Sequence, residues 1–258
     1  MITLFNKETF KLDDILEKMI DDKFYYGHLG DKVLSYSNIK MLLESPKKFK
    51  YVMKYGSPET QALRDGKLVH TAVLEPHKIS DLNFVDTSTK RTKKWTLAVN
   101  EFGKENTFTQ KELASAERIA DALTKNKVAM GLMNKAKTEV PAIKMFNGLP
   151  VRGKADILRE DTVIDLKTTA VGIKNFEYVI DKYDYDLQAY LYTQLYDVPN
   201  FTFLVVDKGT LDIGQFSVGP ETFAKGKAKF EAGLELYNAF FVEKYVDLNE
   251  YVYVKQLK

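Results

Sequence analysis

Three carboxylates and one lysine, on three successive predicted strands, are the residues of this chain most able to do chemistry. They are Glu139, Asp156, Asp165 and Lys167. Acidic side chains held close together repel one another unless a cation lies between them, and oxygen ligands suit Mg²⁺ or Mn²⁺. An ammonium group beside such a cation can offset charge developing on a phosphate or position an attacking water. The pattern therefore favours metal-dependent phosphodiester hydrolysis.

Two predicted turns bring these residues together. Asn147-Gly148 predicts a two-residue hairpin turn, which places Glu139 directly opposite Asp156. A second turn at 159–162 places Asp156 opposite Asp165. Directly opposed side chains share a face of the sheet and lie about 5 Å apart. Ordinary cross-strand pairing on a solvent-facing surface is the alternative, and a β-bulge would break the register. The reverse face carries Ala155, Ile157, Ile164 and Leu166, and the strands are expected at 140–146, 151–158 and 163–168.

Composition limits the class of protein. The chain has 258 residues, no Cys and a formal charge of +2, and it is 45% hydrophobic and 12% aromatic. Such a chain can build a sizeable core, so wholesale disorder is excluded. Without Cys there is no disulfide, thiolate zinc site or Cys nucleophile, which suits a reducing, cytoplasmic compartment. No apolar stretch has the length of a membrane span, so no membrane partner is expected.

Hydrophobic periodicity predicts an α/β (α+β) protein with a central mixed β-sheet flanked by helices. Thr109-x-x-Glu112 is a capping box that begins a long helix. The polar, basic stretch 86–95 is expected to be a loop. Further helices are expected at 61–75, 173–182, 186–197 and 221–244, and further strands at 201–206 and 211–218.

Several motifs, in order, resemble the PD-(D/E)xK nuclease superfamily. They are Gly153-Lys-Ala-Asp156, then Asp165-Leu-Lys167, then Gln188-x-x-x-Tyr192. The RecB-like branch is most similar, especially the exonuclease VIII (RecE-like) recombination exonucleases of phages and prophages. Further segments agree with that family, at 37–49, 66–76, 90–95 and 138–141.

The resemblance implies roles for individual residues. It implies that His70, Asp156 and Asp165 bind Mg²⁺, which Mn²⁺ can replace, with the Leu166 carbonyl as a further ligand. Lys167 is implied to be the catalytic lysine. A site role is also implied for Glu139, which supports the metal or its waters, and for Gln188 and Tyr192, which face the site from one helix. The alternatives without a functional role are a core histidine at position 70 and an ordinary amphipathic helix face at Gln188 and Tyr192.

The same resemblance implies a substrate and partners. The expected substrate is the end of linear double-stranded DNA, degraded 5′ to 3′ to leave 3′ single strands for phage recombination. A single-strand annealing protein is the expected partner, and a ring-shaped homo-oligomer, trimer or tetramer, is the expected assembly. A basic segment is expected to bind DNA, although a solvated loop is the commoner reading of such a run; it comprises Lys90, Arg91, Lys93, Lys94 and Trp95.

The expected domain plan is an N-terminal extension at 1–34 and a single nuclease domain at 35–258. Within the latter, 35–135 is a mainly helical elaboration and 136–245 the restriction-endonuclease-like catalytic core. Three other functions stay open: a single-strand nuclease or endonuclease of the same fold, an inactive DNA-binding module, and an unrelated α/β protein. Related single-strand nucleases with iron–sulfur clusters need four Cys, which this chain lacks. Walker, Gly-x-Ser-x-Gly and zinc motifs are also lacking.

Overall fold

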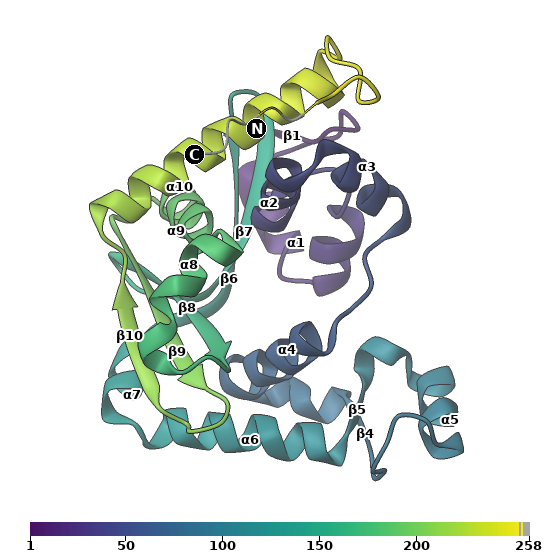
Figure 1. Ribbon diagram of the computed structural model, residues 1–258, viewed down its shortest axis with the longest axis vertical. Helices are drawn as coiled ribbons and strands as arrows, with labels where there is room; N and C mark the ends of the chain where they lie inside the picture. Colours follow the sequence, from purple (N-terminus) through teal and green to yellow (C-terminus); the bar gives the residue numbers. More distant parts are fainter. Residues whose placement is uncertain (253, 255–258) are drawn as a thin grey trace.

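A six-stranded mixed sheet forms the centre of the protein in the computed structural model, which describes residues 1–252 and 254 (Figure 1). The strand order is β10-β9-β8-β7-β3, and β6 pairs with β7 off this path. The mixed sheet with flanking helices confirms the predicted fold class. Its strands are β3 (Leu34–Ser35), β6 (Lys137–Phe146), β7 (Leu149–Leu158), β8 (Thr162–Thr169), β9 (Asn200–Asp207) and β10 (Ile213–Ser217).

The two predicted turns are confirmed, and the register that they set holds in β6–β7 on either side of Glu139 and in β7–β8 as far as Ile157–Ile164. Asn147 and Gly148 have φ values of 49° and 80°, the left-handed region that a primed two-residue turn requires. The β6–β7 pairing follows the predicted alignment from Phe146 to Lys137. At the second turn, the Arg159 amide donates to the Thr162 carbonyl over 2.9 Å.

Helices cover both faces of the sheet. β8 and β9 are parallel, so the chain crosses between them through α8 and α9, as parallel strands require. Along β9, Phe201 and Phe203 pack with α9 and α10, whereas Leu204 and Val206 pack in the cluster formed with α4 and α6. Ile157, Ile164 and Leu166 are fully buried in that second cluster, and Ala155 is fully buried in the first. The helices are α1 (Leu12–Lys18), α2 (Tyr36–Glu44), α3 (Pro46–Tyr55), α4 (Gln61–Leu74), α5 (Lys93–Phe102), α6 (Gln110–Lys125), α7 (Lys127–Met133), α8 (Glu177–Tyr183), α9 (Tyr185–Tyr196) and α10 (Pro220–Tyr237), with π-helical turns at Lys23–His28 and Asn238–Val242 and 3₁₀ turns at Pro76–Asp81, Lys104–Asn106 and Ile173–Asn175.

The N-terminal segment packs onto the sheet through a small core of its own. Ile15, Met19 and Leu29 are fully buried there, against Ile143 of β6. Two further sheets have two strands each: β1 (Ile2–Thr3) with β2 (Thr9–Phe10), and β4 (Asn83–Val85) with β5 (Thr107–Thr109). Among the residues described, no helix is both long and apolar enough to cross a bilayer.

One predicted loop is partly helical. Helix α5 begins at Lys93, inside the stretch 86–95 that was expected to be irregular. The Thr92 side chain accepts a hydrogen bond from the Trp95 amide and so caps the helix. Trp95 is only 7% exposed, and its burial supplies an apolar anchor that a purely polar loop would lack. The loop prediction is therefore wrong from residue 93 onward.

Candidate active site

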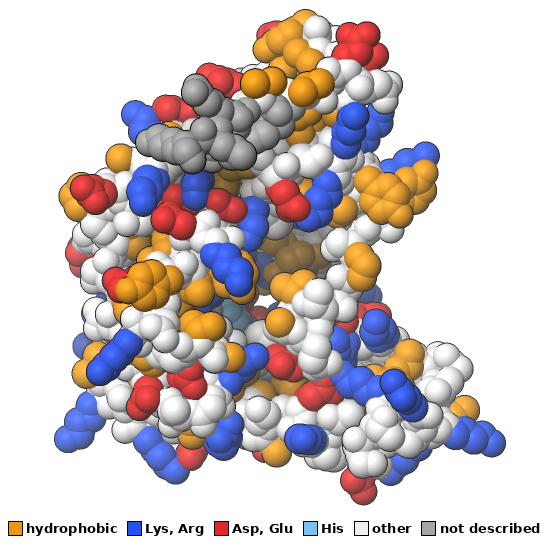
Figure 2. All heavy atoms as spheres, viewed as in Figure 1, with side chains coloured by type: hydrophobic (Ala, Val, Ile, Leu, Met, Phe, Trp, Pro, Cys, Tyr) orange, Lys and Arg blue, Asp and Glu red, His pale blue; other side chains and the backbone are white. Residues whose placement is uncertain are grey.

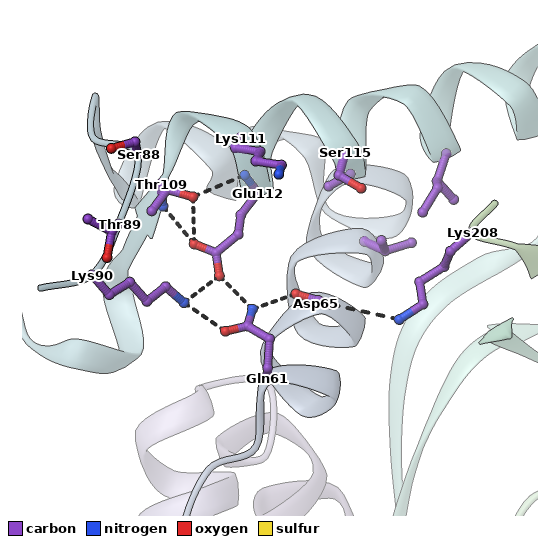
Figure 3. Close-up of a pocket in the computed structure, with 13 residues that line it drawn as sticks. Gln61, Asp65, Ser88, Thr89, Lys90, Thr109, Lys111, Glu112, Ser115 and Lys208 are labelled. Atoms are coloured by element: carbon purple, nitrogen blue, oxygen red, sulfur yellow. Dashed lines mark hydrogen bonds and ion pairs between the residues drawn. The ribbon is translucent and has the colours of Figure 1, made fainter. Parts of the chain in front are cut away.

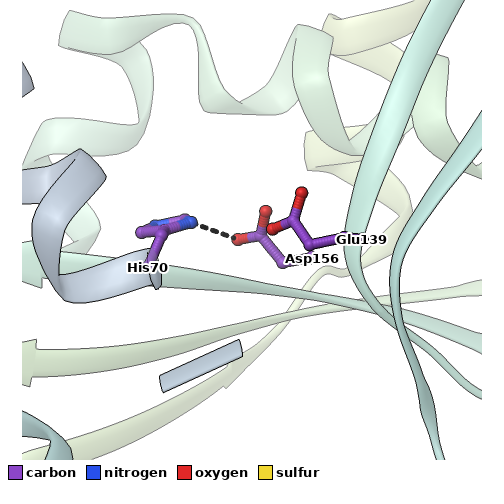
Figure 4. A group of neighbouring side chains, drawn as sticks. All are labelled: His70, Glu139 and Asp156. Carbon is purple, nitrogen blue, oxygen red and sulfur yellow. Dashed lines mark ion pairs between the residues drawn. The ribbon is translucent and has the colours of Figure 1, made fainter. Parts of the chain in front are cut away.

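His70, Glu139 and Asp156 converge from three elements, as Figure 4 shows. One ligand atom from each lies within 4.8 Å of those of the other two. His70 comes from α4, and the two acids come from the adjacent strands β6 and β7. His70 Nδ1 lies 3.5 Å from Asp156 Oδ2, and its Nε2 lies 2.8 Å from the Leu166 carbonyl oxygen. The group joins one imidazole to two carboxylates, a donor set that suits a divalent cation.

A second group of polar residues lies on β8 and α9. Asp165 is 2% exposed, and its Oδ2 lies 2.6 Å from Lys167 Nζ. The Gln188 side-chain amide donates to Asp165 Oδ1 over 2.6 Å. Lys167 also lies over the Tyr185 ring, 4.9 Å from its centroid. The carboxylate of Asp165 is thus turned toward α9 and is not one of the three groups that converge around Asp156.

Asp156 links the two groups through the backbone of β8. Its Oδ2 accepts a hydrogen bond from the Leu166 amide over 2.8 Å. The β7–β8 pairing is recorded at Ile157–Ile164 and Leu158–Val163 and does not continue to Asp156 and Asp165. The expected direct pairing of these two acids is therefore wrong, because Asp156 inserts its carboxylate where the next ladder hydrogen bond would lie.

Glu139 is held in an unusual backbone conformation. Its φ of 52° lies in the left-handed region, within a strand and at a residue other than glycine. Thr138 and Val140 on either side pair regularly with Ile157 and Ala155, so the interruption is confined to Glu139 and Asp156. Such conformations cost about 1–3 kcal/mol and concentrate at functional sites. The local distortion turns the Glu139 carboxylate toward His70 and Asp156.

Burial and mutual repulsion shift the proton affinities of these acids. Burial, together with the charge of Asp156, raises the pKa of Glu139 to about 7. Burial also raises the pKa of Asp165 to about 6, although Lys167 opposes the shift. Burial disfavours charge on His70, but its ion pair with Asp156 outweighs this and raises its pKa to about 9. The His70 imidazolium in turn lowers the pKa of Asp156 against the effect of burial.

These residues fit a divalent cation. Gln188 Oε1 is buried without a hydrogen-bond partner among the described residues, and Asp165 Oδ2 contacts only the Lys167 ammonium there, so both oxygens can accept a further electropositive group. Once His70 gives up its Nδ1 proton, the Nε2–H that donates to the Leu166 carbonyl leaves the Nδ1 lone pair facing Asp156. Metal-binding histidines are commonly oriented in this way. The same contact uses one lone pair of the Leu166 carbonyl oxygen, and the second remains for its expected role as a ligand.

The two residues of the predicted α9 pair lie in different surroundings. Gln188 is 5% exposed and contacts Asp165. Tyr192, one turn later, is 9% exposed and packs in the main core, with its ring centroid 6.3 Å from that of Phe201. The ring also lies against Gly153, where a side chain would collide with it. The structure brings Gln188 into the site and gives Tyr192 a packing position beside it.

The basic segment lies on the part of the protein built from β4, α5, β5 and α6. Arg91, Lys93 and Lys94 are exposed, and Lys94 donates to the Asp86 carbonyl. Lys90 instead forms an ion pair with Glu112 over 2.6 Å, as Figure 3 shows, and the buried Trp95 offers no free face. The structure thus brings none of these residues to the carboxylate cluster. Lys90 and Trp95 have structural contacts, and the other three remain available to a phosphate backbone.

Glu112 anchors this part of the protein, and its removal should destabilise the fold. Burial disfavours its charge, but hydrogen bonds from Lys90, Thr109 and Gln61 outweigh this and lower its pKa from 4.5 to about 2. We expect Glu112→Gln to lower the free energy of unfolding by about 1–3 kcal/mol at pH 7, as measured by urea denaturation. A lowered folded-state pKa stabilises above the unfolded value, so the difference from wild type should shrink as the pH falls from 4.5 to about 2.

The control for this prediction is Glu117→Gln, which alters an exposed carboxylate on the same helix. It should change stability by less than about 0.5 kcal/mol at every pH. Equal stability of wild type and Glu112→Gln at pH 7 would contradict a structural role for the Lys90–Glu112 pair.

Sequence reasoning did not assign a role to Lys154, which lies two residues before Asp156 on the same strand. Its side chain is 7% exposed, forms an ion pair with Asp22 over 2.6 Å, and lies 5.4 Å from the Tyr26 ring centroid. The N-terminal segment therefore reaches the site. The period-two alternation of a strand places Lys154 on the face of Asp156, and this signal was available in Gly153-Lys154-Ala-Asp156.

Comparison with known proteins identifies the family of this chain. The model of the PDDEXK-like domain of unknown function DUF3799 matches residues 35–245. A candidate exonuclease from Eubacterium rectale has a similar structure, with a TM-score of 0.66 at 13% identity over 92% of this chain and 96% of that one. Matches at lower TM-scores include an alkaline exonuclease from Laribacter hongkongensis (0.40, 11% identity, 87% of this chain and 97% of that one) and a phage-related exonuclease from Haemophilus somnus 129PT (0.37, 17% identity, 82% and 96%). No curated protein matches this chain. The match over most of its length shows that the chain belongs to the PDDEXK-like DUF3799 family, within the PD-(D/E)xK nuclease superfamily.

Proposed function

We propose that this protein is a divalent-metal-dependent exodeoxyribonuclease that hydrolyses phosphodiester bonds of linear double-stranded DNA. The observation that carries the proposal is the meeting of His70, Glu139 and Asp156 beside the Asp165–Lys167 pair, in a nuclease-like fold. Acids of an ordinary surface cluster are exposed to solvent, whereas Asp165 and Asp156 are only 2% and 9% exposed. Burial and the charge of Asp156 both raise the pKa of Glu139 and of Asp165, and a bound cation would relieve the repulsion between these neighbouring buried acids.

In this proposal His70, Glu139 and Asp156 hold Mg²⁺, or Mn²⁺ in its place, and Asp165 becomes a ligand when its carboxylate turns from Lys167 toward them. When bound, the cation would stabilise negative charge on the phosphate and make a water molecule more acidic. Two of the proposed ligands must lose a proton before the cation can bind. His70 and Glu139 lose their protons when the site is loaded, so the ligands become available as the pH rises through their raised pKa values.

Lys167 supplies the remaining positive charge. Burial disfavours its charged form, but the charge of Asp165 outweighs this and raises its pKa, so the ammonium is retained at neutral pH. Its Nζ lies within 2.6 Å of Asp165. From this position Lys167 can orient the attacking water or offset the charge that develops on the scissile phosphate. Gln188 fixes the other oxygen of Asp165 and so holds the carboxylate in place.

The resemblance to recombination exonucleases supports the finer parts of the proposal. According to these finer parts, the protein degrades one strand 5′ to 3′ and leaves a 3′ single strand that an annealing protein coats. A ring-shaped trimer or tetramer around the DNA would keep the enzyme on its substrate. The exposed cations Arg91, Lys93 and Lys94 would contact the duplex backbone.

Digestion of linear duplex DNA labelled at the 5′ or the 3′ end tests the proposal, with Mg²⁺ or EDTA present and closed circles as a control. We expect early loss of the 5′ label with Mg²⁺ only, and intact circles. Cleaved circles would show an endonuclease, and faster loss of an end-labelled single strand digested in parallel would show a single-strand nuclease. Absence of cleavage with Mg²⁺ and with Mn²⁺ would contradict enzymatic activity and favour a DNA-binding module.

A further inference from the structure

Helix α3 presents an exposed stripe in which lysines and tyrosines alternate. Lys47, Tyr51 and Tyr55 recur every four residues, and Lys50 and Lys54 lie beside them, so the five side chains share one face of the helix. Tyr51 and Tyr55 are 62% and 63% exposed. Their ring centroids lie 4.8 Å apart, and Lys54 Nζ lies 4.9 Å from the centroid of Tyr55. We call these five residues the α3 stripe.

The opposite side of α3 is fixed to the body of the protein. Phe49 is 4% exposed and lies edge-on to Phe241, with centroids 5.2 Å apart. The Ser45 side chain caps the helix at the Lys48 amide, Pro46 occupies its first turn, and Gly56 ends it with a φ of 77°. The orientation of the α3 stripe is therefore set by packing, and its outward face is a rigid surface.

The charge on this surface is not neutralised within the described residues. Lys48 pairs with Glu44 over 2.7 Å, but Lys47, Lys50 and Lys54 have no acidic group within 4.0 Å there. Figure 2 shows hydrophobic and basic side chains together over α3, at the rim of the hollow that separates α3 from α4 and α5. Two aromatic rings beside unpaired cations, next to the hollowed face, form a surface suited to an anionic partner that also has flat apolar groups.

We propose that the α3 stripe binds single-stranded nucleic acid, with bases stacked on Tyr51 and Tyr55 and phosphates held by Lys47, Lys50 and Lys54. Unpaired bases expose the ring faces that tyrosine stacks on, whereas paired bases hide them inside the duplex. The proposal rests on the proposed function, because an exonuclease that acts on one strand of a duplex leaves the other single-stranded. The α3 stripe would hold that strand apart from the cleavage site.

Binding of a fluorescein-labelled oligothymidylate, measured by anisotropy in EDTA, tests this role without hydrolysis. We expect the double variant Tyr51→Ala/Tyr55→Ala to bind at least 10-fold more weakly, with duplex binding changed less than twofold. In Lys47→Gln/Lys50→Gln/Lys54→Gln, the slope of log K against log salt concentration should become shallower by about 2. Tyr245→Ala, which removes another exposed tyrosine, should bind as wild type does.

Two arms separate this inference from the proposed function. Wild-type affinity of the double-tyrosine variant for the oligonucleotide, or failure of wild type to bind it, would overturn the role of the α3 stripe even if duplex hydrolysis is observed. If the double-tyrosine variant loses binding to anionic phospholipid vesicles but still binds the oligonucleotide as wild type does, the proposal is also overturned and the α3 stripe is assigned to a membrane surface. Failure of wild type to hydrolyse duplex DNA would instead overturn the proposed function. The binding assay in EDTA would still decide whether the α3 stripe binds single strands.

Discussion

Replacing Lys167 with alanine is expected to lower the rate of Mg²⁺-dependent duplex hydrolysis at least 100-fold. The lysine is the cation nearest Asp165, and loss of one preorganised charge-stabilising group typically costs a factor of about 10²–10³ in rate. The measurement is the initial rate on end-labelled linear duplex under single-turnover conditions, so that product release does not mask the chemical step. Lys174→Ala, an exposed lysine seven residues later, is the control and should keep the wild-type rate.

The Lys167→Ala variant should nevertheless remain folded. Breaking a buried ion pair is costly when it leaves a charge without a partner. Here the remaining group is Asp165, whose pKa is about 6 even beside Lys167 and rises further without it. Asp165 can therefore take up a proton near neutral pH at little cost. A melting temperature close to wild type, together with the lost activity, assigns the effect to chemistry, whereas hydrolysis within threefold of wild type would remove Lys167 from the proposed site.

The core strands and their turns were predictable because the signals for them are local. The Asn147-Gly148 turn fixes the alignment of β6 with β7, and the short turn before Thr162 fixes that of β7 with β8. Side-chain periodicity then identified the buried face of β8. The positions of the acids on adjacent strands followed from these features alone.

The orientation of the site acids was not predictable in this way. The Asp156 carboxylate accepts a hydrogen bond from the Leu166 amide, which would otherwise pair with the backbone of β7. The Asp165 carboxylate turns toward Gln188, on a helix some 20 residues later. Lys90 likewise finds its partner in Glu112 on another element. These choices depend on which groups the tertiary fold brings within reach, and residue types along one strand do not encode them. Pairing of Lys154 with Asp22, 132 residues earlier, is a further example.

Replacing Asp156 with asparagine should affect the site more broadly than any other single change. Asp156 contacts His70 and the Leu166 amide and belongs to the cluster with Glu139. We expect Mn²⁺ to bind at least 100-fold more weakly by calorimetry at pH 8, and hydrolysis to fall at least 1,000-fold, because a direct ligand matters more than the outer partners whose loss costs 10–100-fold. At pH 8 the carboxyl groups of Glu139 and Asp165 are largely ionised, and the proton that wild-type His70 must release on binding works against wild type, so it cannot produce the expected loss in the variant.

The metal-free protein offers an independent test of the same residue. Asparagine keeps an oxygen that can accept from the Leu166 amide, so the fold should survive, but it removes the charge that raises the pKa of His70. The pKa of His70, followed by NMR, should fall well below about 9, because burial and the charge of Lys167 are then opposed mainly by the more distant Asp165. Asp13→Asn, an exposed carboxylate of α1, should leave both the titration and Mn²⁺ binding unchanged. An unchanged His70 pKa in Asp156→Asn would mean that the two residues do not interact in solution, and the cluster of His70, Glu139 and Asp156 could then not be the metal site.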